Sequence, residues 1–141
     1  MDLKLVMQAP EVIRLITAGF KADTPFFAID ELQHGYLRAH MPFRNWMLRP
    51  GNVISGPALF TTADLAMYAL VLSHTGPQLM AVTSNLNLNF VNKGLAADVH
   101  AEATLLKLGR KIAVMEVKLR CGDDPALVAH ATGSYALPTP K

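Results

Sequence analysis

Hydrophobic residues near the start of the chain recur at the spacing of an amphipathic helix. Val12, Ile13 and Ile16 repeat at helical intervals after Pro10, a residue that suits a first helical turn. The pair Thr24-Pro25 ends the pattern. We therefore predict a short amphipathic helix in this segment.

Strand-like runs follow, separated by turn residues. FFAIDEL and GYLRAHMPF flank Gln33-His34-Gly35, which predicts two strands and a tight turn, and RNWMLRPGN after them is predicted to be a loop. In the C-terminal half, AVTSNLNLNF alternates polar and apolar residues with a period of two, and Gly109-Arg110 and GDDP provide hairpin connections. The four strands predicted there cover residues 79–91, 98–108, 111–121 and 126–137.

The segment NVISGPALFTTADLAMYALVLSH, residues 52–74, is the most apolar part of the chain and carries the signals of a long helix. Ser55 is a good N-cap, Pro57 fits the first turn, and Gly76-Pro77 follows the end. Apolar residues lie on all sides, so we expect the helix to be buried all round. An antiparallel sheet that curls around the helix would bury it. The sequence therefore predicts one α+β domain over residues 1–141 with the hotdog fold, an antiparallel sheet wrapped around one long central helix.

The composition of the chain favours self-association and argues against several kinds of partner and cellular location. Hydrophobic residues make up 51% of the chain and charged residues 17%, which is more apolar surface than a small monomer can hide, so self-association is expected. The net charge of +2, with no stripe of Lys or Arg, argues against nucleic acid. Charges in MDLKLVMQAPEV argue against a secretion signal, and an acid interrupts the apolar run after Pro57, so no membrane span is expected. Cys121 is the only cysteine, which fits a reducing cytoplasm.

Asp64 is the one carboxylate within the apolar helix. It is the only charged side chain between Arg49 and Lys93, so no neighbour in sequence can neutralise it. A desolvated carboxylate is costly unless it is hydrogen-bonded, paired or protonated. Two interpretations remain open. Asp64 is either a general base in a functional site, or a structural acid that bonds to the backbone or to Thr61 or Thr62, or faces a wet subunit interface.

Gly56 is the second candidate in the helix. Backbone N–H groups in a first helical turn lack partners within the helix. Because Gly56 has no side chain, a ligand carbonyl could approach its N–H closely enough to be bound as in an oxyanion hole. The ordinary alternative is a glycine beside the cap Ser55. Eight residues separate Gly56 from Asp64, or about 12 Å along a helix, too far for both to serve one carbonyl. If both act, one chain must supply Gly56 and another Asp64 across a twofold interface.

Three motifs occur in order over about residues 50–137: the helix segment SGPALFTTADLAM, the strand AVTSNLNLNFV, and the hairpin LLKLGRKIAVMEVKL followed by ALVAHATGSYAL. Together they resemble the PaaI-type acyl-CoA thioesterases of the hotdog superfamily. The pattern of that family is His-Gly-Gly followed by an acid further along the central helix, then an LNINF-like strand and a GR-x-x-A hairpin. The resemblance implies an enzyme that hydrolyses acyl-CoA to a free acid and CoA, needs no cofactor, and assembles as a homodimer or a dimer-of-dimers homotetramer.

The resemblance also implies residue roles. Asp64 would be the catalytic carboxylate, as base or nucleophile, and the Gly56 N–H would be the oxyanion donor. Thr83 would help to place the attacking water and Asn52 would touch the substrate carbonyl, although a polar residue on a strand or before a helix is commonplace. Cations of the LKLGRK hairpin would bind the CoA phosphates, unless they are simply solvated. These cations are Lys107, Arg110 and Lys111, with Lys93 and Arg44 behind them.

The chain departs from the family pattern at the start of the helix. Ser55 stands where the family has His, and Pro57 replaces the second Gly. Ser55 can cap the helix or donate a weaker bond to substrate, but it cannot be cationic or a base at neutral pH. The alternative function is therefore a non-catalytic hotdog protein that binds acyl-CoA or an aromatic ligand. A hydratase is disfavoured because Asp64 has no His at a matching spacing. The five histidines are scattered without metal-ligand spacing, so no metal site is predicted.

Overall fold

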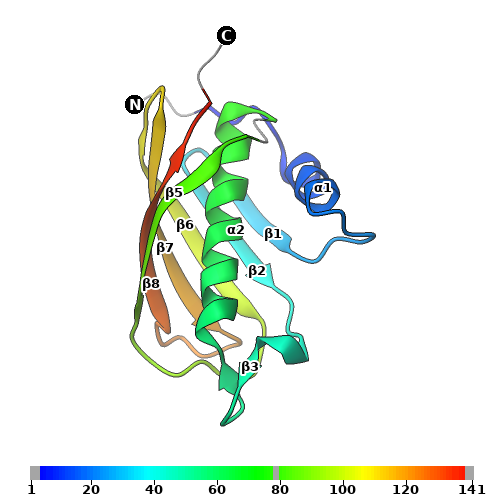
Figure 1. Ribbon diagram of the computed structural model, residues 1–141, viewed down its shortest axis with the longest axis vertical. Coiled ribbons are helices and arrows are strands. Elements are labelled where there is room, and N and C mark those ends of the chain that lie inside the picture. The colour runs from blue at the N-terminus through cyan, green and yellow to red at the C-terminus, as the bar shows by residue number, and fades with distance from the viewer. Residues whose placement is uncertain (1–3, 78–79, 139–141) are drawn as a thin grey trace.

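The computed structural model describes residues 4–77 and 80–138. Six strands form one antiparallel sheet in the order β1-β2-β6-β7-β8-β5, and the sheet curls around α2 (Figure 1). This arrangement confirms the predicted α+β hotdog fold. The elements in chain order are α1 (Ala9–Gly19), β1 (Ala28–Gln33), β2 (Tyr36–Met41), the 3-10 helix η1 (Asn45–Met47), β3 (Leu48–Arg49), β4 (Val53–Ile54), α2 (Gly56–Thr75), β5 (Val82–Phe90), β6 (Val99–Leu108), β7 (Ile112–Cys121) and β8 (Ala129–Ala136).

The central helix α2 begins and ends where its sequence signals place it. The Ser55 hydroxyl accepts a hydrogen bond from the Ala58 N–H at 3.2 Å, Pro57 lies in the first turn, and Gly76 ends the helix with φ of 88°. By length and composition α2 could cross a membrane, with a mean hydropathy of 1.2, but 67% of that window is buried inside this fold. Its apolar character is thus accounted for by packing against the sheet.

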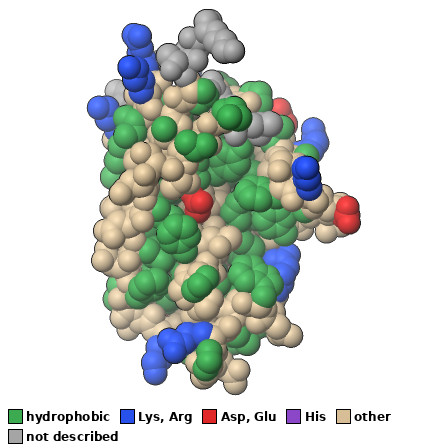
Figure 2. All heavy atoms as spheres, in the orientation of Figure 1, with side chains coloured by type: hydrophobic (Ala, Val, Ile, Leu, Met, Phe, Trp, Pro, Cys, Tyr) green, Lys and Arg blue, Asp and Glu red, His purple; other side chains and the backbone are tan. Residues whose placement is uncertain are grey.

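One stripe of α2 is not covered within the chain, which corrects the prediction that the helix is buried all round. Phe60 is 45% exposed, and Asp64 and Tyr68 are only partly buried, whereas Met67 and Leu70 on the other side are fully buried. The stripe repeats at helical spacing, so it forms one continuous face. Hydrophobic side chains gather over α2 and β5 on the side of the molecule seen in Figure 2.

The segment before α2 is more ordered than the predicted loop. It contains η1 and the two short strands β3 and β4, which pair with each other apart from the main sheet. Met47 is fully buried, and its backbone oxygen accepts a hydrogen bond from the Ser55 N–H at 2.8 Å. These contacts fix the direction in which the chain enters α2. Elements of two or three residues are too short to produce a recognisable period in the sequence.

Close packing of β8 against α2 and β5 positions the candidate site. Along β8 every second residue is buried, ending in Gly133 and Tyr135. A Cβ atom at Gly133 would lie 2.6 Å from Met67 Cε and 2.7 Å from the backbone oxygen of Asn85, so only glycine permits this approach. The pairing of β5 with β8 also shifts register between Thr83 and Asn85. Tyr135 and Thr83 are thereby brought next to the middle of α2.

Candidate active site

The carboxylate of Asp64 is held by two side chains from the sheet. The Tyr135 hydroxyl donates a hydrogen bond to Asp64 Oδ1 at 2.6 Å, and the Thr83 hydroxyl donates to the same oxygen at 2.7 Å. The Tyr135 hydroxyl also lies 3.1 Å from the backbone oxygen of Asp64. Among the described residues, no donor reaches Oδ2. The carboxylate is therefore oriented through one oxygen and presents the other to a ligand or a water.

Tyr135 is the residue at this site that sequence reasoning missed. Its side chain is only 3% exposed, and burial, followed by the negative charge of Asp64, raises the pKa of its phenol above the ordinary value. The phenol consequently stays protonated and remains a donor to Asp64. Its ring stacks on Tyr68, with centroids 6.0 Å apart and planes 11° apart. A signal was present in ATGSYAL, because a tyrosine at an inward position of an alternating strand needs a partner for its hydroxyl.

Asp64 opens into a cavity of about 420 Å³. The wall combines the carboxylate and its two donors with apolar groups at the end of α1, at the start of β5 and on α2, so a ligand there would meet one acid in mostly apolar surroundings. The lining residues are Gly19, Phe20, Asp64, Tyr68, Ala81, Val82, Thr83 and Tyr135.

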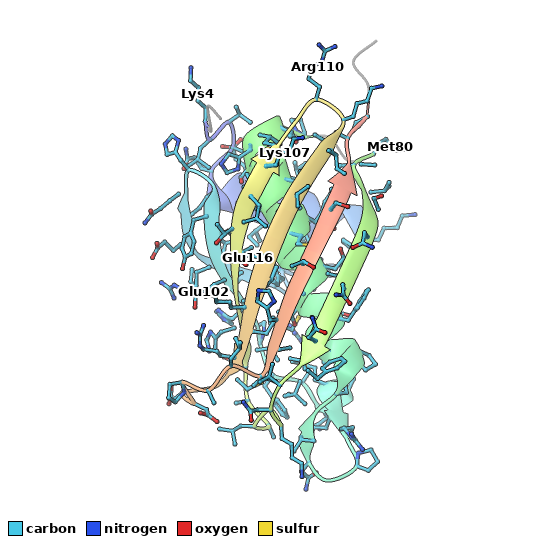
Figure 3. All side chains as sticks on the ribbon, turned by 90° about the vertical axis from the view of Figure 1, so that its left-hand side faces the viewer. Lys4, Met80, Glu102, Lys107, Arg110 and Glu116 are labelled. Carbon is cyan, nitrogen blue, oxygen red and sulfur yellow. The ribbon has the colours of Figure 1, made fainter. Side chains whose placement is uncertain are left out.

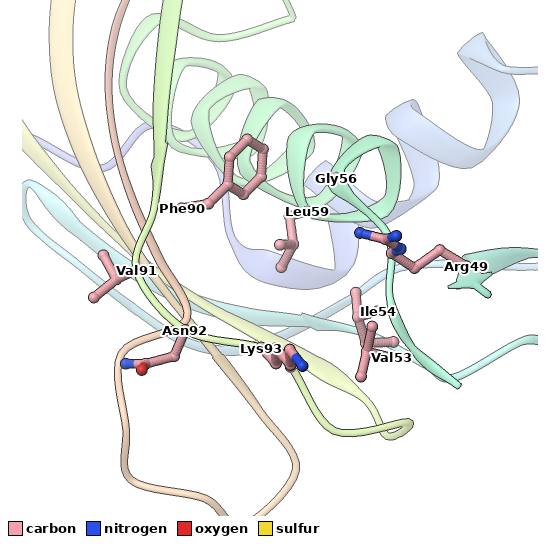
Figure 4. Close-up of a pocket in the computed structure, with 10 residues that line it drawn as sticks. Arg49, Val53, Ile54, Gly56, Leu59, Phe90, Val91, Asn92 and Lys93 are labelled. Carbon is pink, nitrogen blue, oxygen red and sulfur yellow. The ribbon is translucent and has the colours of Figure 1, made fainter. Parts of the chain in front are cut away.

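Gly56 lies between two other cavities at the start of α2. One, of about 470 Å³, also contains the cations Arg49 and Lys93 (Figure 4). The other, of about 590 Å³, is apolar and lies between α2 and β5, with Phe60 and Phe90 in its wall. Among the described residues the Gly56 N–H donates to no other residue. A backbone donor, the positive end of the helix dipole and two cations thus surround one cavity, a combination suited to an anionic ligand.

The remaining predicted residues lie in different places. Ser55 is engaged as the helix cap, and Asn52 lies exposed in the turn between β3 and β4 with φ of 57°. The hairpin cations are at the end of the sheet opposite to the N-terminus of α2: Figure 3 labels Lys107 and Arg110 there, and Lys111 immediately precedes β7. Within one chain the structure therefore joins Thr83 to Asp64 but does not bring the hairpin cations to Gly56.

Arg44, which was predicted to help bind phosphates, is used within the chain, whereas Arg49, which was not predicted, lines the cavity at Gly56. Arg44 donates to the backbone oxygens of Phe26 and Pro42, so its guanidinium joins two chain segments. Arg49, which the sequence did not single out, lines the cavity beside Gly56 together with Lys93. The β3–β4 pairing places Arg49 opposite Val53, and this pairing had no signal in the sequence.

Gly56 and Asp64 line separate cavities within one chain. This agrees with the expectation that eight residues of helix hold them too far apart to act on one carbonyl. Both residues lie on the part of α2 that the chain leaves partly uncovered.

Comparison with known proteins shows the family of this chain. The sequence profile of the thioesterase superfamily matches residues 51–128. A crystal structure named "putative thioesterase" from Silicibacter sp. TM1040 is 36% identical, covers 96% of this chain and 95% of its own, and superposes with a TM-score of 0.88. A variant of the phenylacetic acid degradation protein PaaI from Thermus thermophilus is 21% identical over 79% of this chain and 93% of its own, with a TM-score of 0.69, and shares the fold.

A more distant sequence relative is "Putative esterase Ta0293" of Thermoplasma acidophilum, which is 23% identical over 109 residues, or 77% of this chain and 81% of its own length. The profile match covers more than half of the chain, and the Silicibacter structure is similar over nearly the whole length of both proteins. The chain belongs to the thioesterase superfamily of hotdog-fold proteins.

Proposed function

We propose that this protein is an acyl-CoA thioesterase, which hydrolyses a thioester to a free acid and CoA. The observation that carries the proposal is the convergence of Tyr135 and Thr83 on a single oxygen of Asp64. This arrangement orients a carboxylate at the wall of a largely apolar cavity and leaves Oδ2 to act as a base. A purely structural acid in an apolar helix would be expected to have both oxygens satisfied.

The reaction needs a base and an oxyanion donor. Asp64 Oδ2 takes a proton from a water molecule, whose oxygen attacks the thioester carbonyl carbon. The negative charge that develops on the carbonyl oxygen is stabilised by the Gly56 N–H. Collapse of the tetrahedral intermediate breaks the C–S bond, and the leaving CoA thiolate takes up the proton that Asp64 had accepted from water, which regenerates the carboxylate. Thiolates are good leaving groups, so no strong general acid is required, and a His in place of Ser55 is not essential.

The active site in this proposal lies between two subunits. Gly56 and Asp64 of one chain line different cavities, so an antiparallel pair of α2 helices would place Gly56 of one protomer over Asp64 of its partner. The exposed apolar side chains of Phe60 and Phe90 beside Gly56 supply surface for this contact. Each dimer then holds two equivalent sites, whether or not two dimers associate further.

Arg49 and Lys93 are the cations best placed for the phosphates of CoA. They lie in the cavity beside Gly56, where the thioester carbonyl would bind, and both are exposed. Lys107, Arg110 and Lys111 lie at the far end of the same chain, so they could contribute only from another subunit.

The proposal is tested by thiol release from short, long and aromatic acyl-CoAs with the wild type and Asp64→Asn. We expect Asp64→Asn to lower kcat by roughly 100-fold or more, because general-base catalysis contributes about that much, and to retain affinity for the substrate. Asp123→Asn, a matched change in the exposed turn after β7, should leave kcat unchanged.

Two outcomes would contradict the proposal. Equal rates for the wild type and Asp64→Asn would exclude Asp64 as the base. A wild type that binds acyl-CoA or an aromatic ligand but releases no thiol across the whole series would instead indicate a binding protein, the alternative that Ser55 in place of the family His had raised.

A further inference from the structure

Three metal-ligating side chains meet on the face of the sheet turned away from α2. His40 on β2 and His100 on β6 are directly opposed in the β2–β6 register, and their rings are 5.6 Å apart. Asp30 on the edge strand β1 approaches His40 Nδ1 with both carboxylate oxygens, at 2.8 and 3.0 Å. One ligand atom from each of the three residues lies within 4.8 Å of the others. Cross-strand pairing, which sequence spacing did not reveal, creates this cluster.

The geometry of the cluster is compatible with a tetrahedral metal ion. Zn²⁺ binds His nitrogen and carboxylate oxygen at about 2.0–2.2 Å, which places neighbouring ligand atoms about 3.4 Å apart. Asp30 and His40 are already within this separation. A ligand atom of His100 lies within 4.8 Å of those of Asp30 and His40, and none of the three side chains is buried, so each is free to change rotamer towards a shared ion.

The charges around the cluster do not oppose a cation. Arg120 on β7 is opposite His100 in the β6–β7 register, but its guanidinium forms an ion pair with Glu102 and donates to the backbone oxygen of Pro125. Figure 3 shows Glu102 and Glu116 on this face of the sheet. Asp30 is therefore a carboxylate beside two imidazoles. Arg38, two residues before His40 on β2, pairs with Glu31 at 3.6 Å, so Arg38 and Arg120 are each already paired with an acid.

We propose that Asp30, His40 and His100 form a binding site for Zn²⁺, with water in the remaining coordination position. Two imidazoles and a carboxylate suit a borderline divalent transition metal rather than Mg²⁺ or Ca²⁺, which prefer all-oxygen sets. The ion joins the edge strand β1 to β2 and β6. Since the unfolded chain does not bring the three ligands together, binding raises the thermal stability of the fold. The site is separate from Asp64 and Gly56, which belong to the helix on the other face.

The test uses the full chain without a polyhistidine tag, dialysed against EDTA and titrated with Zn²⁺ by calorimetry. We expect one ion per chain and a higher Tm with Zn²⁺. Asp30→Asn and His100→Ala should each raise the Kd at least about tenfold. With Co²⁺ in place of Zn²⁺, the wild type should show the visible absorption of a tetrahedral site and His100→Ala should not.

His130→Ala is the matched control. His130 lies on the same face and pairs with Glu116 at 3.3 Å, so it presents a histidine and a carboxylate without a third ligand among the described residues. This variant should bind Zn²⁺ like the wild type. The proposal is overturned if the wild type shows no saturable binding, if His100→Ala binds as tightly as the wild type, or if His130→Ala loses binding to the same extent.

Discussion

At the scale of single residues, the carboxylate of Asp64 depends on hydroxyl groups brought by two strands. Tyr135 is buried and Thr83 is exposed, so the two bonds differ in the cost of losing them. A buried donor to a charged acceptor has no water to replace it, whereas the bond from an exposed hydroxyl is easily exchanged for one from solvent. Tyr135 is therefore the main positioning residue of the proposed base.

We predict that Tyr135→Phe lowers kcat by roughly 10- to 100-fold, because a hydrogen bond to a charged group contributes about 1.5–3 kcal/mol, while KM changes little. The ring stays stacked on Tyr68, so the fold is preserved. Tyr36→Phe is the matched control, since the Tyr36 hydroxyl also donates to a carboxylate, Glu102, at 3.1 Å on the opposite face. Thiol release and urea unfolding of both variants check the prediction. A kcat equal to that of the wild type in Tyr135→Phe would contradict it.

The residues of the proposed site differ in how far the sequence could identify them. Asp64 was evident because an unneutralised acid in an apolar helix is costly, and Gly56 because first-turn N–H groups lack partners. Tyr135 and Arg49 were not, since each reaches its place through pairing with a distant or very short strand. The same reason hid the meeting of His40 with His100, which depends on the register of β2 with β6.

At the scale of elements, α2 is joined to the β1–β2 turn by a buried histidine. The Gly35 N–H donates to His74 Nε2 at 2.9 Å, and His74 Nδ1 lies 3.0 Å from the Leu70 backbone oxygen. Nε2 must therefore be unprotonated and Nδ1–H the donor. Burial lowers the pKa of His74 below its ordinary value of 6.5; the Leu70 bond opposes this shift and the nearby His34 adds to it. Neutral His74 thus connects the helix to the hairpin.

We predict that the free energy of unfolding decreases as the pH falls below about 6.5. The pKa of His74 is lower in the folded protein than in the unfolded chain, so as the pH falls the unfolded chain binds a proton first. The stability that neutral His74 contributes above about pH 6.5 is therefore lost as the pH falls through this value to the folded pKa. His74→Ala should lose about 1–3 kcal/mol at neutral pH, since the buried Gly35 N–H is left without an acceptor, and should show a flatter pH dependence. Urea unfolding between about pH 5 and 8 measures both effects. In His130→Ala, a change on the outer face, the free energy of unfolding should still show the pH dependence that comes from His74. A pH dependence as steep in His74→Ala as in the wild type would contradict the prediction.

The periodicity of the sequence predicted the positions of the long helix and strands, but it did not predict which part of the protein covers their apolar faces. The helix 56–75 and the strands β6 to β8 follow their apolar patterns because each packs along many residues. The stripe of α2 that includes Phe60 was predicted to be buried, but no described part of the chain covers it. A period of apolar residues indicates that a face is to be buried, not whether the same chain or a second copy buries it.

At the scale of the whole molecule, the separation of Gly56 from Asp64 means that a site using both residues requires two chains. The two residues line different cavities of one chain, and the exposed Phe60 and Phe90 lie on the side of α2 that contains both. If each site is composed of two chains, a defect in Gly56 of one protomer and a defect in Asp64 of its partner fall in the same site. The other site of such a dimer is then intact.

We predict that two inactive variants restore activity when they are combined. Asp64→Asn lacks the base. Gly56→Val is expected to obstruct the proposed oxyanion donor, because even a Cβ at Gly56 would lie 3.3 Å from Phe90 Cζ and a valine adds two methyl groups. Co-expression of the two variants gives about half mixed dimers, each with one intact site of two, so the preparation should have about a quarter of the wild-type kcat per chain. Thiol release before and after separation of mixed dimers by two different affinity tags measures this value.

The two controls distinguish a shared site from one that lies within a single chain. The separately expressed variants, mixed without unfolding or subunit exchange, should stay inactive. The double variant Gly56→Val/Asp64→Asn co-expressed with wild type should give mixed dimers in which both sites carry one defect, and these dimers, once separated, should be inactive although half of their chains are wild type. If each site instead used Gly56 and Asp64 of the same chain, the results would be reversed: the complementary pair would be inactive, and the dimers with one wild-type chain would keep half of the activity. Activity in the second kind of mixed dimer and none in the first would therefore exclude the composite site while leaving Asp64 as the base.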